Sequence, residues 1–113
     1  MSRNQWIDWA EDCWSGIRET NTLNTKNAKS EDDTRHICPL QLDVIERLVR
    51  LYSNPGEIVF SPFTGIGSEG YMALKLHRRF YGCELKDEYH AEALLNMERA
   101  LRERVEQAEL LFA

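Results

Sequence analysis

Long apolar runs are missing from this sequence of 113 residues. No stretch approaches the roughly 18 apolar residues that a membrane-spanning helix needs. The beginning of the chain has no basic region followed by an apolar core, so no secretory signal is visible. We therefore expect a protein of the cytoplasm that does not associate with a membrane.

Cysteine is also scarce, and the three cysteines that are present show no C-x-x-C spacing. An odd number of isolated cysteines (Cys13, Cys38 and Cys83) is typical of reduced thiols in a cytoplasm. His36 and Cys38 have a spacing that two metal ligands can adopt, but no second pair completes a site. We expect no metal.

Basic charge is in deficit, because 14 lysines and arginines stand against 19 acidic residues, which gives a net charge of −5. A protein that binds nucleic acid unaided usually presents a basic face. Here the basic residues are dispersed, and Arg78 and Arg79 are the only tight pair before the C-terminal helix. If the whole protein acts on DNA, we expect the surface that grips DNA to lie elsewhere.

The composition that remains is that of an ordinary globular protein, with 42% hydrophobic and 29% charged residues and a length that suffices for one small core. Within residues 1–35, Trp6, Trp9 and Cys13 are spaced to share one face of a helix. We favour a helix that packs its tryptophans on the core, and a base-stacking surface is the alternative. Residues 21–33 are polar and predict a linker, so residues 36–113 are the expected main domain.

After His36 the pattern becomes that of an amphipathic helix. Pro39 suits the first helical turn, and the Asn-Pro-Gly at residues 54–56 ends the helix. Apolar residues recur at every fourth position, namely Leu40, Val44, Leu48 and Tyr52, with Ile45 and Val49 beside them. Two pairs of opposite charge are spaced to support the helix: Asp43–Arg47 and Glu46–Arg50.

Residues 56–85 organise the rest of the chain and read GEIVFSPFTGIGSEGYMALKLHRRFYGCEL. A short apolar run leads into a glycine-rich turn, a helix-compatible stretch follows, and a second apolar run ends on Glu84. Apolar runs without polar alternation suit parallel strands that are covered on both faces. The order of strand, glycine loop, helix, strand and acid is that of the first unit of a nucleotide-type binding sheet.

The glycine loop carries residue types that suit a ligand site. Gly65 and Gly67 allow the backbone to turn sharply and to approach a ligand closely. Ser68 and Glu69 stand where a helix favours a capping residue and a first-turn acid. Glu84 follows Gly67 by 17 residues, close to the spacing of about 20 between such a loop and an acid that binds a ribose diol. A G-x-G after a strand is also typical of a plain tight turn, and the spacing alone leaves both interpretations open.

From Asp87 a long helix is expected, with its charged face in solvent. Its apolar residues recur at spacings of three and four: Tyr89, Ala93, Met97, Leu101, Val105 and Ala108.

Four blocks of this sequence, in this order, resemble the C-terminal part of DNA amino-methyltransferases. They are HICPLQL at 36–42, NPG at 54–56, SPFTGIGS at 61–68 and GCEL at 82–85. The family is that of the N4-cytosine/N6-adenine methylases in circularly permuted order, and the likeness is strongest to members from phages and mobile elements. The resemblance implies an α/β fold, namely a partial Rossmann-like S-adenosylmethionine-dependent methyltransferase fold with parallel strands, flanking helices and an incomplete sheet.

The resemblance also implies roles for individual residues. One group is similar to the loop that holds the methionine part of S-adenosylmethionine: Ser61, Pro62, Phe63, Gly65, Gly67 and Ser68. A second group resembles the block that helps to hold the methionine end: His36, Pro39 and Leu40. Glu84 resembles the acid that binds the cofactor ribose, and Leu85 resembles an apolar contact near the adenine.

Two departures from the family pattern accompany the likeness. Ser61 stands where the family usually has Asp, which leaves the role of this position open. The family's Asp/Asn/Ser-Pro-Pro-aromatic tetrapeptide, which binds the target amino group and stacks on the extruded base, is absent, because no two of the three prolines are adjacent. We therefore predict no catalytic residue in this chain and no activity of the chain alone. We expect that a catalytic half, upstream or on a separate chain, supplies the motif and the contact with DNA.

The expected function is that of the cofactor-binding part of a site-specific DNA methyltransferase. Such an enzyme transfers a methyl group from S-adenosylmethionine to N6 of adenine or N4 of cytosine, as in DNA methylation for restriction-modification. Two alternatives stay open at this point. One is a non-catalytic remnant or interaction module that keeps the fold, and the other is a methyltransferase part that acts on another substrate.

Overall fold

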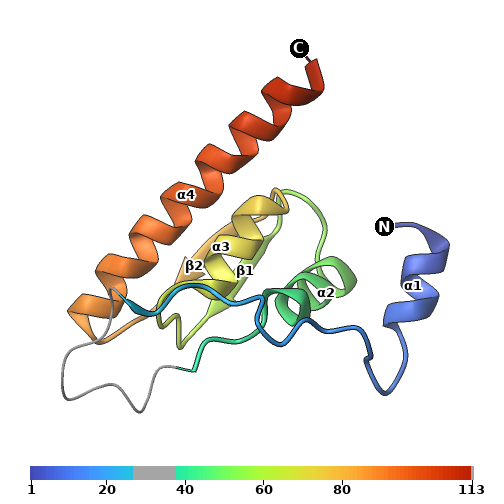
Figure 1. The fold of residues 1–113 in the computed structure, drawn as a ribbon, viewed down its shortest axis with the longest axis horizontal. Helices are drawn as coiled ribbons and strands as arrows, with labels where there is room; N and C mark the ends of the chain where they lie inside the picture. Colours follow the sequence, from blue (N-terminus) through green and yellow to red (C-terminus); the bar gives the residue numbers. More distant parts are fainter. Residues whose placement is uncertain (27–37, 113) are drawn as a thin grey trace.

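The computed structural model describes residues 1–26 and 38–112. Figure 1 shows the elements in chain order: α1 (Arg3–Trp9), α2 (Leu42–Tyr52), β1 (Ile58–Ser61), α3 (Ser68–Lys75), β2 (Arg79–Gly82) and α4 (Asp87–Phe112). This order confirms the expected α/β class. In the described ranges, no helix combines the length and the apolar character that crossing a membrane requires.

The sheet consists of β1 and β2, which pair in parallel from Ile58↔Arg79 to Ser61↔Gly82. The crossover between them is α3, as the sequence predicts for a strand–loop–helix–strand unit. Val59 packs against the core, whereas the neighbouring side chains of Ile58 and Phe60 are each 57% exposed. Within the described residues the sheet is therefore covered on one face only, and the expectation of two covered faces is not met.

The uncovered face of the sheet is apolar, and two of its aromatic side chains stack on each other. The rings of Phe60 and Tyr81 stack across the two strands, with centroids 5.9 Å apart and planes inclined by 28°. Tyr81 is 65% exposed. We call the exposed side chains of Ile58, Phe60 and Tyr81 the open face.

The core lies between α2, α3 and α4, on the covered side of the sheet. From α2 it receives Leu42, Ile45 and Val49. The predicted apolar stripe of this helix is confirmed at Ile45 and Val49, whereas it is wrong at Leu48 and Tyr52, which are 42% and 81% exposed. Apolar residues occupy two neighbouring faces of α2, and contact with α3 selects the side of the predicted stripe that carries Ile45 and Val49.

The start of α2 also differs from the prediction. The helix begins at Leu42, because Gln41 has an extended backbone and acts as the N-cap residue. The backbone N–H of Leu42 donates to the carbonyl oxygen of Asn21 at 2.8 Å. Pro39 therefore precedes the helix and is not in its first turn.

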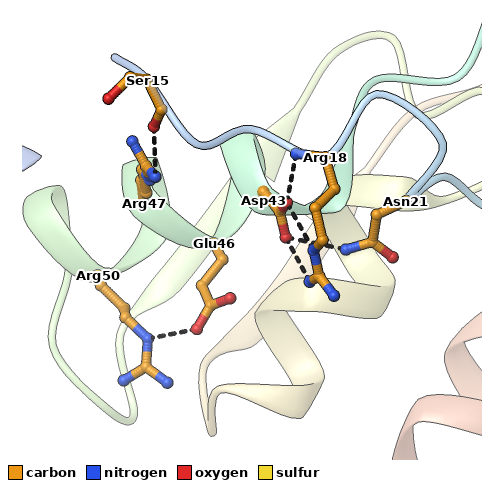
Figure 2. A network of polar contacts seen from close by, with 7 residues as sticks. All are labelled: Ser15, Arg18, Asn21, Asp43, Glu46, Arg47 and Arg50. Atoms are coloured by element: carbon orange, nitrogen blue, oxygen red, sulfur yellow. Dashed lines mark hydrogen bonds and ion pairs between the residues drawn. The ribbon is translucent and has the colours of Figure 1, made fainter.

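The N-terminal segment crosses α2 and is fastened to it by polar contacts (Figure 2). The Arg18 guanidinium donates to both carboxylate oxygens of Asp43, at 2.7 and 3.0 Å, and Asn21 donates to the same carboxylate at 2.9 Å. These hydrogen bonds, with that of Arg18 the largest contribution, lower the pKa of Asp43 well below its usual range. Leu23, which follows, is 3% exposed and belongs to the core.

Figure 2 also shows that only one of the two predicted charge pairs of α2 forms. Arg50 donates to Glu46 at 2.9 Å, as predicted. Asp43 is engaged by the N-terminal segment, so the predicted pair with Arg47 does not form. Arg47 instead donates to the carbonyl oxygen of Ser15 at 2.9 Å.

The tryptophans do not pack as predicted. No residue of α1 is buried, and the helix ends at Trp9. Arg47 lies over the rings of Trp9 and Trp14, with its guanidinium carbon 5.6 and 5.5 Å from the two ring centroids. The indole N–H of Trp14 donates to the carbonyl oxygen of Trp9 at 2.7 Å. These two indoles are therefore held by a cation from α2 rather than by an apolar core.

The long helix α4 is held by contacts that reach as far as Arg104, because Glu103 accepts from the Tyr71 hydroxyl at 2.6 Å and Arg104 donates to the carbonyl oxygen of Leu74 at 2.9 Å. Ala93, Asn96 and Ala100 are buried, whereas Leu101 and Val105 of the predicted stripe are 45% and 58% exposed. The C-terminal half of α4 projects past the sheet (Figure 1). The predicted stripe thus describes the buried face of α4 only in the first half of the helix.

Candidate functional site

The glycine loop joins the end of β1 to the start of α3. Gly65 and Gly67 have φ values of +55° and +88°, which favour glycine. A Cβ on Gly67 would lie 3.0 Å from the Cα of Ala93, so α4 leaves no room for a side chain there. Gly67 is also the N-cap residue of α3. The predicted capping role of Ser68 is therefore wrong, and Ser68 is a buried residue of the first turn.

Two side chains from later elements hold this loop. Glu84 accepts a hydrogen bond from the backbone N–H of Gly65 at 2.8 Å and one from that of Lys86 at 2.9 Å. The Asn96 amide, which is buried, donates to the carbonyl oxygen of Ile66 at 2.9 Å. The loop is thus held by Glu84, which follows β2, and by Asn96 of α4. It lies beside Glu84 at the carboxyl ends of the two strands.

A cavity of about 190 Å³ opens beside this loop. Five of the residues with an expected cofactor role line it together, namely Pro39, Leu40, Phe63, Gly65 and Ser68. The sequence reasoning did not assign a cofactor role to the other lining residues: Cys38, Thr64, Ile66, Glu69 and Tyr89. The lining residues come from residues 38–40, from the loop with the first turn of α3, and from α4 through Tyr89.

The remaining residues with an expected role lie around this cavity or apart from it. Ser61 is buried at the end of β1, and its carbonyl oxygen accepts from the backbone N–H of Cys83 at 3.0 Å. Pro62 and Gly67 belong to the loop without lining the cavity, and Leu85 is 100% exposed. His36 lies outside the described residues.

Among the described residues that line the cavity, Glu69 is the only acidic or basic side chain. It is half-buried in the first turn of α3. Burial raises the pKa of Glu69, opposed by the hydrogen bond from its own backbone N–H. In the described ranges it forms no hydrogen bond or ion pair with another residue. The sequence identified Glu69 as a first-turn acid, but only the fold places it in the cavity.

Two larger cavities, of about 640 and 580 Å³, border Arg50, Pro55 and Arg78. They lie at the amino ends of the strands, whereas open α/β sheets bind ligands at the carboxyl ends. The Arg78 guanidinium already donates to the carbonyl oxygens of Ser53 and Leu76, at 2.7 and 2.6 Å, so these hydrogen bonds give it a structural role there. We therefore place the candidate site at the smaller cavity. Over the described ranges, no group of three or more His, Cys, Asp and Glu side chains could hold a metal ion.

Comparison with known proteins identifies the family. Residues 1–95 match the family described as DNA methylase. The chain belongs to the DNA amino-methyltransferase family. The resemblance seen in the sequence is thereby confirmed, while the permuted order and the phage-type origin stay predictions.

This methylase chain is similar to curated relatives over part of their length. It is 38% identical over 80 residues to the type II methyltransferase M1.MboII of Moraxella bovis, covering 71% of this chain and 29% of that protein. It is 42% identical over 59 residues to the type II methyltransferase M.BglII of Bacillus subtilis, covering 52% of this chain and 16% of that protein. The methylase chain therefore spans less than a third of these two relatives.

Solved structures share the fold of the methylase chain. A DNA modification methylase of Thermus thermophilus, TTHA0409, superposes with a TM-score of 0.67 at 25% identity, over 89% of this chain and 36% of that one. M1.HpyAVI in complex with S-adenosylmethionine (SAM) superposes with a TM-score of 0.53 at 30% identity, over 64% of this chain and 35% of that one. The described elements thus correspond to about a third of a larger methylase.

Proposed function

We propose that this chain is the cofactor-binding part of a DNA methyltransferase and holds S-adenosylmethionine at the glycine loop. The observation that carries the proposal is the meeting of the loop with Glu84 at the carboxyl ends of two parallel strands, joined by the hydrogen bond from Gly65. The complex of M1.HpyAVI with SAM supports the proposal, because that protein is 30% identical to this chain in the aligned region.

The residues around the cavity suit the polar groups of this cofactor. A carboxylate offers about four acceptor sites, and two of those on Glu84 are used by the N–H groups of Gly65 and Lys86. The other two can accept hydrogen bonds from a ribose diol. Apart from that of Glu69, which donates to its own carboxylate, the first N–H groups of α3 have no intrahelical partner and suit the methionine carboxylate. The exposed Leu85 and Phe63 offer apolar surface to an adenine ring.

The bound cofactor supplies an electrophilic methyl group. The residues of this chain bind and orient that group for a target amine, which is catalysis by proximity. His36, Pro39 and Leu40 are assigned to the methionine end. Since none of these side chains needs to exchange a proton, we propose that the chain carries no catalytic residue.

The remaining parts of the enzyme belong to a partner segment. The cavity is smaller than the roughly 300–1,000 Å³ of typical ligand pockets, which fits a site that further residues complete. The open face of Ile58, Phe60 and Tyr81 also fits a missing layer, because parallel sheets are normally covered on both faces. We propose that a catalytic half, on the same polypeptide or a separate chain, supplies this layer, the Pro-Pro motif and the DNA contact.

The net charge of −5 agrees with a DNA-binding surface outside these residues. The target is an exocyclic amine, N6 of adenine or N4 of cytosine. Alone, the chain should transfer no radiolabelled methyl group from S-adenosylmethionine to DNA.

Calorimetric titration of S-adenosylmethionine into the purified, folded chain tests the cofactor site. Glu84→Ala removes the acceptors for the ribose, and a charge-assisted hydrogen bond contributes about 1.5–3 kcal/mol, so we expect affinity to fall about 10- to 100-fold for each ribose hydrogen bond that is lost. Glu88→Ala is the matched control, because Glu88 is an exposed acid four residues further on and lines no part of the cavity. No binding by the folded wild-type chain refutes a cofactor site held by these residues.

A further inference from the structure

Within the part of the chain that the structure describes, the Glu69 carboxylate has no hydrogen bond or ion pair with another residue and accepts only its own backbone N–H. It lines the same cavity as Gly65 and Ser68. An acid in the first helical turn stabilises the helix through the macrodipole, but that role needs no cavity and is fulfilled equally by a solvated side chain. Glu69 is instead half-buried beside Phe63 and Ile66. A carboxylate withdrawn from water with only its own N–H as a donor is unfavourable until a cation or a further donor reaches it.

The other carboxylate at the loop is differently placed. Glu84 already accepts two backbone N–H groups and is not part of the cavity lining. Glu69 therefore has the free acceptor sites that face the ligand space. Apart from that of Glu69 itself, the N–H groups of the first turn of α3 have no intrahelical partner, and the cavity combines them with these acceptors. This pairing of an anionic acceptor with backbone donors is complementary to a zwitterionic α-amino acid.

We propose that Glu69 binds the α-ammonium group at the methionine end of S-adenosylmethionine. This inference rests on the proposed function. The cofactor has two cationic centres, and they differ in chemistry: the ammonium group donates three hydrogen bonds, whereas the sulfonium has no N–H to donate. The free acceptor sites of Glu69 are filled by the ammonium group and not by the sulfonium. The carboxylate of the same amino acid then lies at the N–H groups of α3.

Three ligands separate these assignments in calorimetric titrations of the full chain. S-Adenosylmethionine has both cations, S-adenosylhomocysteine keeps the ammonium but lacks the sulfonium charge, and 5′-methylthioadenosine lacks the amino acid altogether. The variant is Glu69→Gln, which keeps the size of the side chain and removes its charge. The control is Glu88→Gln, since Glu88 is also a first-turn acid, in α4 and outside the cavity.

We expect Glu69→Gln to weaken S-adenosylmethionine and S-adenosylhomocysteine by the same factor, about tenfold or more. The affinity for 5′-methylthioadenosine should not change, and Glu88→Gln should leave all three affinities unchanged. Equal affinities in Glu69→Gln and wild type overturn the inference.

Two other results also overturn it. A loss confined to S-adenosylmethionine places Glu69 at the sulfonium. A loss that extends to 5′-methylthioadenosine shows that Glu69 acts through the loop and not on the amino acid. If the folded wild-type chain binds none of the three ligands, the proposed function is refuted, and the inference that rests on it is refuted too. All the other outcomes require that the wild-type chain binds, so they test the role of Glu69 alone.

Discussion

The burial of Leu23 makes a quantitative prediction about the N-terminal segment. Leu23→Ala removes three carbon atoms from a residue that is 3% exposed. At about 0.8 kcal/mol for each buried carbon, transfer to water alone costs about 2.4 kcal/mol. The cavity that remains adds to this cost, so we expect the free energy of unfolding to fall by about 2.5–4 kcal/mol.

Urea denaturation followed by far-ultraviolet circular dichroism measures this change. Leu48→Ala is the matched control, because Leu48 lies on α2 and is 42% exposed. It should cost less than about 1 kcal/mol, since much of its side chain already contacts water. Leu23→Met keeps the apolar volume and should cost less than about 1.5 kcal/mol, which preserves a folded comparison if Leu23→Ala does not fold.

The reasoning is refuted if Leu23→Ala destabilises the chain no more than Leu48→Ala does. Such a result would mean that the segment around Leu23 does not belong to the core. A large loss in both Leu23 variants would instead show that the site tolerates no change of shape, and the area-based magnitude would be wrong.

Three further predictions concern the loop and its surroundings. Gly67→Ala forces a Cβ onto a left-handed backbone and against Ala93, and it should cost about 2–4 kcal/mol of unfolding free energy in urea titration and abolish cofactor binding. Asn96→Leu leaves the carbonyl oxygen of Ile66 unpaired, so we expect a loss of about 1–3 kcal/mol and faster amide hydrogen exchange in the loop, whereas unchanged exchange would contradict its role. Folding lowers the pKa of Asp43, so its ionised carboxylate stabilises the folded chain at pH values above the unfolded pKa of about 3.9. This stabilisation is lost as the pH falls through that value towards the folded pKa. The unfolding free energy of Asp43→Asn, measured by acid titration, should lack this decline.

Local signals explain what the sequence predicted. The strand–loop–helix–strand unit follows from apolar runs and from Gly65 and Gly67, whose effects are confined to neighbouring residues. The face of α2 could not be predicted in the same way, because both Leu48 and Val49 belong to apolar stripes of that helix. Contact with α3 decides which stripe is buried, and a single periodic pattern does not contain that information.

The residues of the candidate site also divide into those that local sequence signals predict and those whose roles depend on contacts between distant segments. The glycines and Glu84 follow from their spacing and from the family resemblance. Asn96 and Glu69 were missed because their roles depend on contacts between distant segments. Asn96 lies 30 residues after the carbonyl group that it binds. The acid at position 69 is ordinary for a helix start until the neighbouring wall, from Cys38 to Leu40, turns it into part of a cavity.

The arrangement of Arg47 between two indoles has a spectroscopic consequence. All three tryptophans of the chain (Trp6, Trp9 and Trp14) lie within its first 14 residues, so intrinsic fluorescence reports on the N-terminal segment and its contact with α2. No indole lies at the glycine loop. A change of emission on ligand addition would therefore measure communication from the cavity through α2, and constant emission during measurable heat release would show that the loop binds its ligand independently of that segment.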